Sequence, residues 1–122
     1  MGKITKEDII LLFLEDPLKL ETEIFKENVP KSDEIRTLIC ELGNPWCAYW
    51  YAELIDKKPT DETRTVACKD PYEAYWYAKT VDKKPTDETR EAAYKNPDYK
   101  EMYKKWENSL KNITIKKDCQ VF

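Results

Sequence analysis

The sequence contains no histidine, and only two of its 122 residues are glycine. Without histidine, the chain has neither the Ser-His and Cys-His pairs that activate nucleophiles nor a histidine-based metal site. The shortage of glycine argues against glycine-rich phosphate loops and tight β-hairpins. We therefore expect a helical protein that is not an enzyme.

Long apolar segments are also absent. The longest one, Ile9 to Leu14, has six residues, whereas a helix needs about 20 to cross a bilayer. The amino terminus lacks the apolar region and cleavage site of a secretory signal peptide. We therefore expect a cytoplasmic protein without a membrane partner.

The cysteines are widely spaced, and none belongs to a Cys-x-x-Cys pair. Zinc sites use closely spaced cysteine and histidine ligands, so we expect no metal ion and no cofactor. In a reducing cytoplasm such residues are small buried thiols, which we expect to be unpaired. They are Cys40, Cys47, Cys68 and Cys119.

Charged residues make up 37% of the chain, with both signs interspersed and a net charge of −3. Such a balance gives no basic surface for nucleic acid. A mean hydropathy of −0.80 is typical of disordered chains. The chain nevertheless has four Trp, eight Tyr and three Phe, which indicates a packed core.

A tandem repeat dominates the sequence. Residues 45–70 and 71–96 are identical at 17 of 26 positions, and a third copy begins at Pro97 and then diverges. An older copy lies upstream, where residues 32–40 align with residues 60–68. We therefore divide a single domain, 1–122, into a leading helix (5–15), repeats 17–44, 45–70 and 71–96, a capping repeat (97–111) and a C-terminal tail (112–122).

Each unit is predicted to form two helices. The first begins at an Asx-Pro step, because Asn or Asp caps the free amides and proline fits the first helical position. The second begins at Thr60 or Thr86, each followed by two acids that suit a helix N-terminus. Such units bury their apolar faces by stacking. The predicted fold is all-α, a short α-solenoid of stacked helical hairpins with 26–28 residues per repeat.

The segments 45–52 and 71–78 share the pattern Asx-Pro-x-x-Ala-Tyr-x-Tyr-Ala once the preceding Asn44 or Asp70 is included. This pattern resembles short tandem helical repeats in uncharacterised phage and bacterial proteins. The resemblance covers about half of the chain strongly. It implies the fold and a phage or bacterial origin, and it implies no activity or catalytic residue.

The first helix of each unit carries a stripe of large aromatic residues. Aromatic side chains exposed on a surface commonly anchor protein interfaces, although the same stripe can form the core between units. The candidate binding residues are Trp46, Tyr49, Trp50, Tyr72, Tyr75 and Trp76.

Arginine also recurs, at positions 36, 64 and 90. Arg64 and Arg90 are therefore further candidate binding residues. The alternative is that each arginine stacks on a tyrosine of the neighbouring unit or bridges to an acid.

These features favour a non-catalytic protein-interaction module, with a protein partner whose identity the sequence does not give. A phage origin would suggest a host-directed or anti-defence protein acting in the host cytoplasm. Two alternatives are single-stranded nucleic-acid binding by the aromatic residues, against which the lack of a basic groove argues, and a structural or oligomeric component of a particle.

Overall fold

The computed structural model describes residues 3–120, with the side chains of residues 3–111. Over this range the fold is all-α, with eight α-helices and no strands. The helices are α1 (Lys6–Glu15), α2 (Pro17–Phe25), α3 (Asp33–Leu42), α4 (Pro45–Trp50), α5 (Asp61–Ala67), α6 (Pro71–Trp76), α7 (Asp87–Ala93) and α8 (Pro97–Gln120).

The predicted helix starts are confirmed by their caps. The side chains of Asp16, Asn44 and Asp70 accept hydrogen bonds from the backbone amides two residues ahead, at 3.0, 3.0 and 3.2 Å. Ser32, Thr60 and Thr86 cap the second helices. The leading helix has a reciprocal capping box between Thr5 and Asp8. The boundaries of the hairpins therefore follow from local side-chain chemistry.

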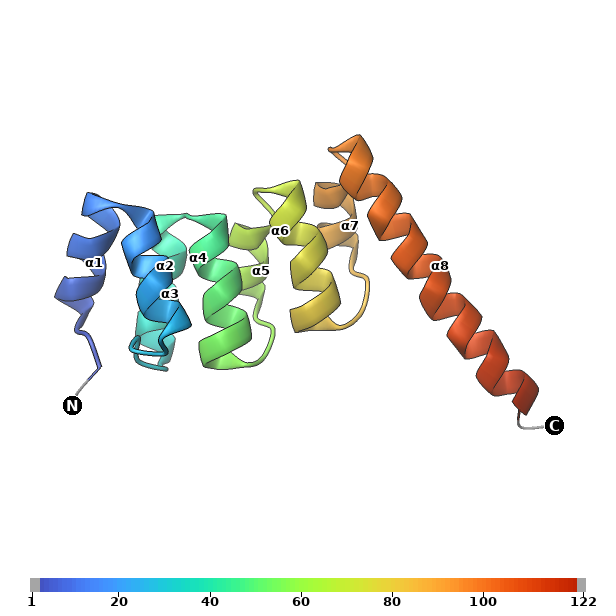
Figure 1. Ribbon diagram of the computed structural model, residues 1–122, viewed down its shortest axis with the longest axis horizontal. Helices are drawn as coiled ribbons and strands as arrows, with labels where there is room; N and C mark the ends of the chain where they lie inside the picture. Colours follow the sequence, from blue (N-terminus) through green and yellow to red (C-terminus); the bar gives the residue numbers. More distant parts are fainter. Residues whose placement is uncertain (1–2, 121–122) are drawn as a thin grey trace.

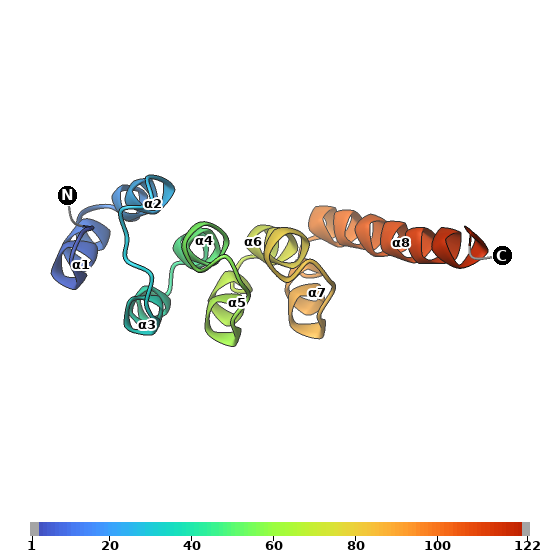
Figure 2. The ribbon, with the colours of Figure 1, turned by 90° about the horizontal axis from the view of Figure 1, so that it is seen from below.

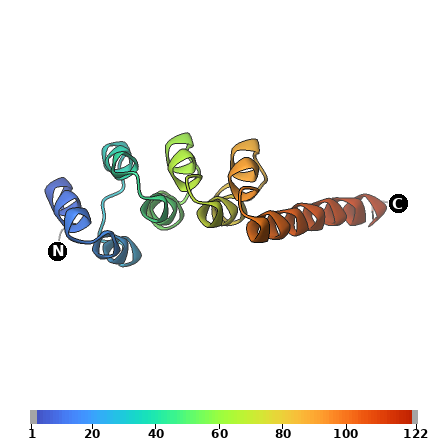
Figure 3. The same cartoon turned by 90° about the horizontal axis from the view of Figure 1, so that it is seen from above.

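The helix pairs stack into an elongated array (Figure 1). The views from below and above show two layers, with α2, α4, α6 and the start of α8 in one layer and α3, α5 and α7 in the other (Figures 2 and 3). Helix α8 extends beyond the array (Figure 1), and the segment 112–120 continues it. Proline-initiated, tyrosine-rich units thus repeat along the chain, as the predicted solenoid requires.

The first helices of the two tandem units do not remain α-helical to their ends. Helix α4 continues as the π-helix η1 (Tyr51–Asp56), and α6 continues as η2 (Tyr77–Asp82). A π-helix closes i→i+5 hydrogen bonds. It therefore brings Tyr51 and Asp56, which are five residues apart, to the same side of the helix, where both contact the α3 unit.

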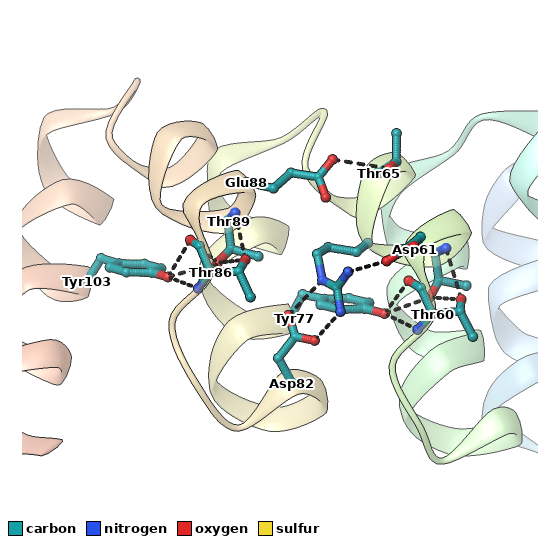
Figure 4. Close-up of polar contacts among 11 residues, drawn as sticks. Thr60, Asp61, Thr65, Tyr77, Asp82, Thr86, Glu88, Thr89 and Tyr103 are labelled. Atoms are coloured by element: carbon teal, nitrogen blue, oxygen red, sulfur yellow. Dashed lines mark hydrogen bonds and ion pairs between the residues drawn. The ribbon is translucent and has the colours of Figure 1, made fainter.

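Tyrosine hydroxyls connect each unit to the preceding one (Figure 4). The hydroxyl of Tyr77 accepts from the Thr60 amide at 3.1 Å, donates to the Thr60 carbonyl at 3.1 Å and lies 2.7 Å from the Thr63 hydroxyl. Tyr103 makes the equivalent contacts with Thr86 and Thr89. Because each tyrosine bonds a helix cap, the next unit stabilises the start of the second helix before it.

The core changes character along the array. Around α1 to α4 it is mainly aliphatic, with buried Ile, Leu and Val. Between the later units it consists largely of buried tyrosine and alanine, including Tyr77, Ala52 and Ala67, and then Tyr103, Ala78 and Ala93. The small alanines let the helices approach closely, so the tyrosine rings fill the space between units.

Three of the cysteines, Cys40, Cys47 and Cys68, are free thiols, and their predicted unpaired state is confirmed. Burial raises the pKa of each to about 12, which keeps them as thiols. The side chain of Cys119 lies outside the described residues. Among the helices of residues 3–120, none has both the length and the apolar character needed to cross a membrane.

Candidate functional site

A groove with a volume of about 490 Å³ lies on the layer of first helices. It spans three successive units, because its walls come from α2, α4 with η1, and α6 with η2. The structure thus brings together side chains that are far apart in the sequence. The lining residues are Glu21, Trp46, Tyr49, Trp50, Glu53, Tyr72, Glu73, Trp76 and Thr80.

Five of the six aromatic candidates line this groove, and they differ in exposure. Trp46 and Tyr72 are 44% and 43% exposed, Tyr49 is buried, and Trp50 and Trp76 are partly buried. The sixth, Tyr75, is buried towards the last unit, with its ring centroid 6.4 Å from that of Tyr103. The stripe is therefore buried at Tyr49 and Tyr75 and accessible at Trp46 and Tyr72.

Contacts within the chain fix the groove walls. The Trp46 indole N–H donates to Asp70 at 3.2 Å, which ties the start of α4 to the start of α6. The hydroxyl of Tyr49 lies 2.9 Å from that of Thr80. The ring centroid of Trp50 lies 4.8 Å from that of Tyr49. The aromatic walls are thus held in place before any ligand arrives.

Three carboxylates in the groove were missed by the sequence reasoning. Glu21, Glu53 and Glu73 come from α2, η1 and α6. Glu73 is only 4% exposed, and burial, with smaller contributions from Asp70 and Glu21, raises its pKa to about 8. Burial also raises the pKa of Glu21, against the effect of a hydrogen bond with Trp50. The groove is therefore both aromatic and acidic.

Three buried polar atoms at the groove have no hydrogen-bond partner among the described residues. They are Oε2 of Glu53, Oε2 of Glu73 and Nε1 of Trp76. Buried polar groups are almost always paired in proteins, so each unpaired one calls for a specific explanation. Two unpaired acceptors and one unpaired donor thus belong to residues that line one groove.

The structure does not bring Arg64 and Arg90 to this groove. The Arg64 side chain reaches Asp82 of the next unit, with Nε–Oδ2 and Nη2–Oδ1 distances of 3.0 and 2.6 Å. Its guanidinium lies 5.8 Å from the centre of the Tyr77 ring. Arg90 pairs in the same way with Glu107, with Nη2 2.9 Å from Oε2. The expected bridges to acids are therefore present, as is the stacking of Arg64 on a tyrosine.

Arg36 completes this series by pairing with Asp56, at 2.7 and 3.0 Å. Each arginine lies on the second helix of one unit, and its acid lies near the end of the first helix of the next unit or, for Glu107, within α8. We call these three pairs the joint ion pairs. They explain why arginine recurs at the same repeat position without a role in the groove.

Within the described side chains, no group of three or more cysteine, aspartate or glutamate residues is arranged to hold a metal ion. The three groove carboxylates come from three different helices, α2, η1 and α6. Comparisons with protein families, with curated proteins and with solved structures found no match.

Proposed function

We propose that the protein is a non-catalytic interaction module that uses the groove on its first helices to bind a protein partner. The observation that supports this most strongly is the position of Trp46 and Tyr72, two half-exposed aromatic side chains beside a groove with buried walls. Such residues gain much buried area on binding and lose little rotamer entropy. A rigid array with a preformed groove suits recognition.

Single-stranded nucleic acid is a poorer candidate ligand. Bases could stack on the tryptophan and tyrosine rings, as they do in other aromatic grooves. The same groove contains Glu21 and Glu53, however, and carboxylates repel the phosphate backbone. The aromatic residues therefore fit a protein segment better than a nucleic acid.

A structural role in an assembly is the second candidate. It is supported by exposed leucines at the amino-terminal end of the array, where Leu11, Leu14 and Leu18 are uncovered. Exposed apolar side chains in one region commonly mark contact surfaces. Sedimentation analysis would show a concentration-dependent oligomer if this surface joins copies of the chain.

The resemblance to phage and bacterial repeats extends the proposal to a biological setting. A small acidic module that occupies a partner's surface fits a host-directed or anti-defence role in the host cytoplasm. This part of the proposal rests on the sequence pattern at residues 45–52 and 71–78.

The proposal is tested by affinity capture from the source cell, followed by mass spectrometry. Trp46→Ala combined with Tyr72→Ala should weaken binding of the captured partner by more than tenfold, because both anchors are removed. Met102→Ala is the matched control, since it removes an exposed apolar side chain of α8 that does not line the groove. Equal binding by the double variant and the control would contradict the proposed binding face.

A further inference from the structure

Two glutamates that line the groove have carboxylate oxygens without a hydrogen-bond donor in the described part of the chain. Glu73 is nearly completely buried, and its Oε2 has no donor among the described residues. The buried Oε2 of Glu53, on the neighbouring unit, is in the same state. A desolvated carboxylate oxygen without a donor is unfavourable by about 1–3 kcal/mol. Both oxygens are closed off from solvent, so a ligand N–H reaches them only when the two glutamate side chains turn towards the groove.

The aromatic walls favour a ligand with positive charge. Cations are attracted to the faces of tryptophan and tyrosine rings, most strongly where water is excluded. One cation of this chain already uses such a face, because the Lys79 ammonium lies 5.3 Å from the centre of the Trp76 ring and 5.4 Å from that of Tyr75. The groove combines such faces with the acids Glu21, Glu53 and Glu73.

Different cations fit these features unequally. A metal ion is disfavoured because no three acids or cysteines among the described side chains are grouped so as to hold one. A quaternary ammonium has no N–H to offer Glu53 and Glu73. A lysine ammonium has three donors around one point but no flat face, whereas a guanidinium has five N–H groups in a planar fork that also stacks on aromatic rings. Only the guanidinium combines several N–H donors with a flat face that stacks on the rings.

We propose that the groove binds the guanidinium group of an arginine residue in the partner protein, with Glu53 and Glu73 accepting its N–H groups and the tryptophan rings covering its flat face. This rests on the proposed function, since the arginine belongs to the partner that the module captures.

The repeat itself indicates that this site occurs at one junction. In the α6–α8 junction, the positions equivalent to Glu53 and Glu73 hold Lys79 and Tyr99. There the lysine supplies a positive charge from within the chain. Among the tandem units, the pair of acids is found only where unit 45–70 faces unit 71–96, so one arginine is bound per chain.

The test uses tryptophan fluorescence titrations with three blocked pentapeptides that carry arginine, citrulline or lysine at the centre. Citrulline keeps the shape of arginine but is neutral. The arginine peptide should bind at least tenfold more tightly than either of the others. No arginine-dependent signal up to about 10 mM peptide, equal binding of citrulline, or tighter binding of lysine would overturn the proposal.

A double variant tests whether Glu53 and Glu73 are the residues that bind the arginine peptide. Glu53→Gln combined with Glu73→Gln should lower affinity for the arginine peptide at least tenfold and leave the citrulline peptide unchanged. Glu91→Gln, on the exposed surface of α7, is the matched control. An undiminished arginine preference in the double variant would overturn the assignment of the acids.

The proposed binding face and the proposed arginine site can each be contradicted independently of the other. If partner capture depends on Trp46 and Tyr72 but not on Glu53 and Glu73, the binding face is right and the arginine assignment is wrong. If the arginine peptide binds through the acids while capture ignores Trp46 and Tyr72, the groove chemistry is right and the proposed binding face is wrong.

Discussion

The tandem units 45–70 and 71–96 are identical at 17 of 26 positions, and the nine differences are distributed unevenly. The residues that connect units are the same in both copies, including Tyr51 and Tyr77, and Arg64 and Arg90. Four of the nine differences fall at the groove, as Trp46/Tyr72, Cys47/Glu73, Glu53/Lys79 and Leu54/Thr80. Each connecting residue must fit an equivalent partner residue in the adjacent unit, so it is the same in both copies. The groove residues have no such constraint and can acquire separate roles.

The largest expected loss of stability comes from removing one partner of a joint ion pair. In Asp56→Ala the buried Arg36 loses its buried partner and keeps only the exposed Asp33, so we expect a loss of about 3 kcal/mol in the free energy of unfolding. Exposure of the arginine side chain increases from 10% for Arg36 to 16% for Arg64 and 34% for Arg90. Asp82→Ala should therefore cost slightly less, and Glu107→Ala about 1 kcal/mol. Urea denaturation would measure the series.

Asp61→Asn is the control for the joint ion pairs. Asp61 also pairs with Arg64, at 2.8 Å, but its side chain is fully exposed. Such surface pairs contribute little, so the change should cost less than about 0.5 kcal/mol. Equal losses in Asp61→Asn and Asp82→Ala would show that burial does not set the strength of the joints.

Changing Glu73, which corresponds to Cys47 in the other copy, should have a smaller effect on stability. This change should stabilise the protein. Its pKa is raised from 4.5 to about 8 in the folded protein, so the folded state holds its proton more tightly than the unfolded state. Ionisation of the unfolded chain then favours unfolding increasingly from about pH 4.5 to pH 8. Glu73→Gln should therefore stabilise the protein by about 1–2 kcal/mol at pH 8, and hardly at pH 4.

Thermal melts across this pH range would check the prediction for Glu73. Glu91→Gln should give the same melting temperature as the unaltered protein at each pH, because Glu91 is exposed. A constant difference between Glu73→Gln and the unaltered protein from pH 4 to pH 8 would show that the Glu73 carboxyl is not responsible.

The smallest effect is expected at Trp46 and its counterpart Tyr72. Both side chains are nearly half exposed, so either one changed to alanine should lower the free energy of unfolding by less than about 1 kcal/mol. Circular dichroism melts would measure this change. A loss of about 3 kcal/mol, typical of a core aromatic residue, would place these residues in the core and remove them from the binding face.

The fold could be predicted because its boundaries are encoded locally. An Asx-Pro step such as Asn44-Pro45 caps a helix wherever it occurs, and the internal repeat shows that the units must pack on one another. The π-helices could not be predicted, since the shift from i→i+4 to i→i+5 bonding in η1 and η2 follows from contacts with the preceding unit. The tyrosine–cap contacts across units were missed for the same reason.

The candidate site was predicted in part. The aromatic stripe follows from helical spacing, which places Trp46, Tyr49 and Trp50 on one side. The acids were missed because a glutamate in a helix normally faces solvent. Glu73 is buried where α4 packs beside α6. Helix α2 packs on α4 in turn and brings Glu21 to the same groove from another unit. In the sequence, the divergence between the tandem copies at Cys47/Glu73 and Glu53/Lys79 is the feature that marks these acids.

The tyrosine–cap contacts have a consequence for how the gene can change length. Every unit offers Thr60 or its equivalent to the unit after it and presents Tyr77 or its equivalent to the unit before it. A duplicated stretch of 26 codons would therefore meet complementary partners on both sides. Recombination between the near-identical copies would lengthen or shorten the array in whole units, without leaving an unmatched surface, and would copy or erase the groove in the same step.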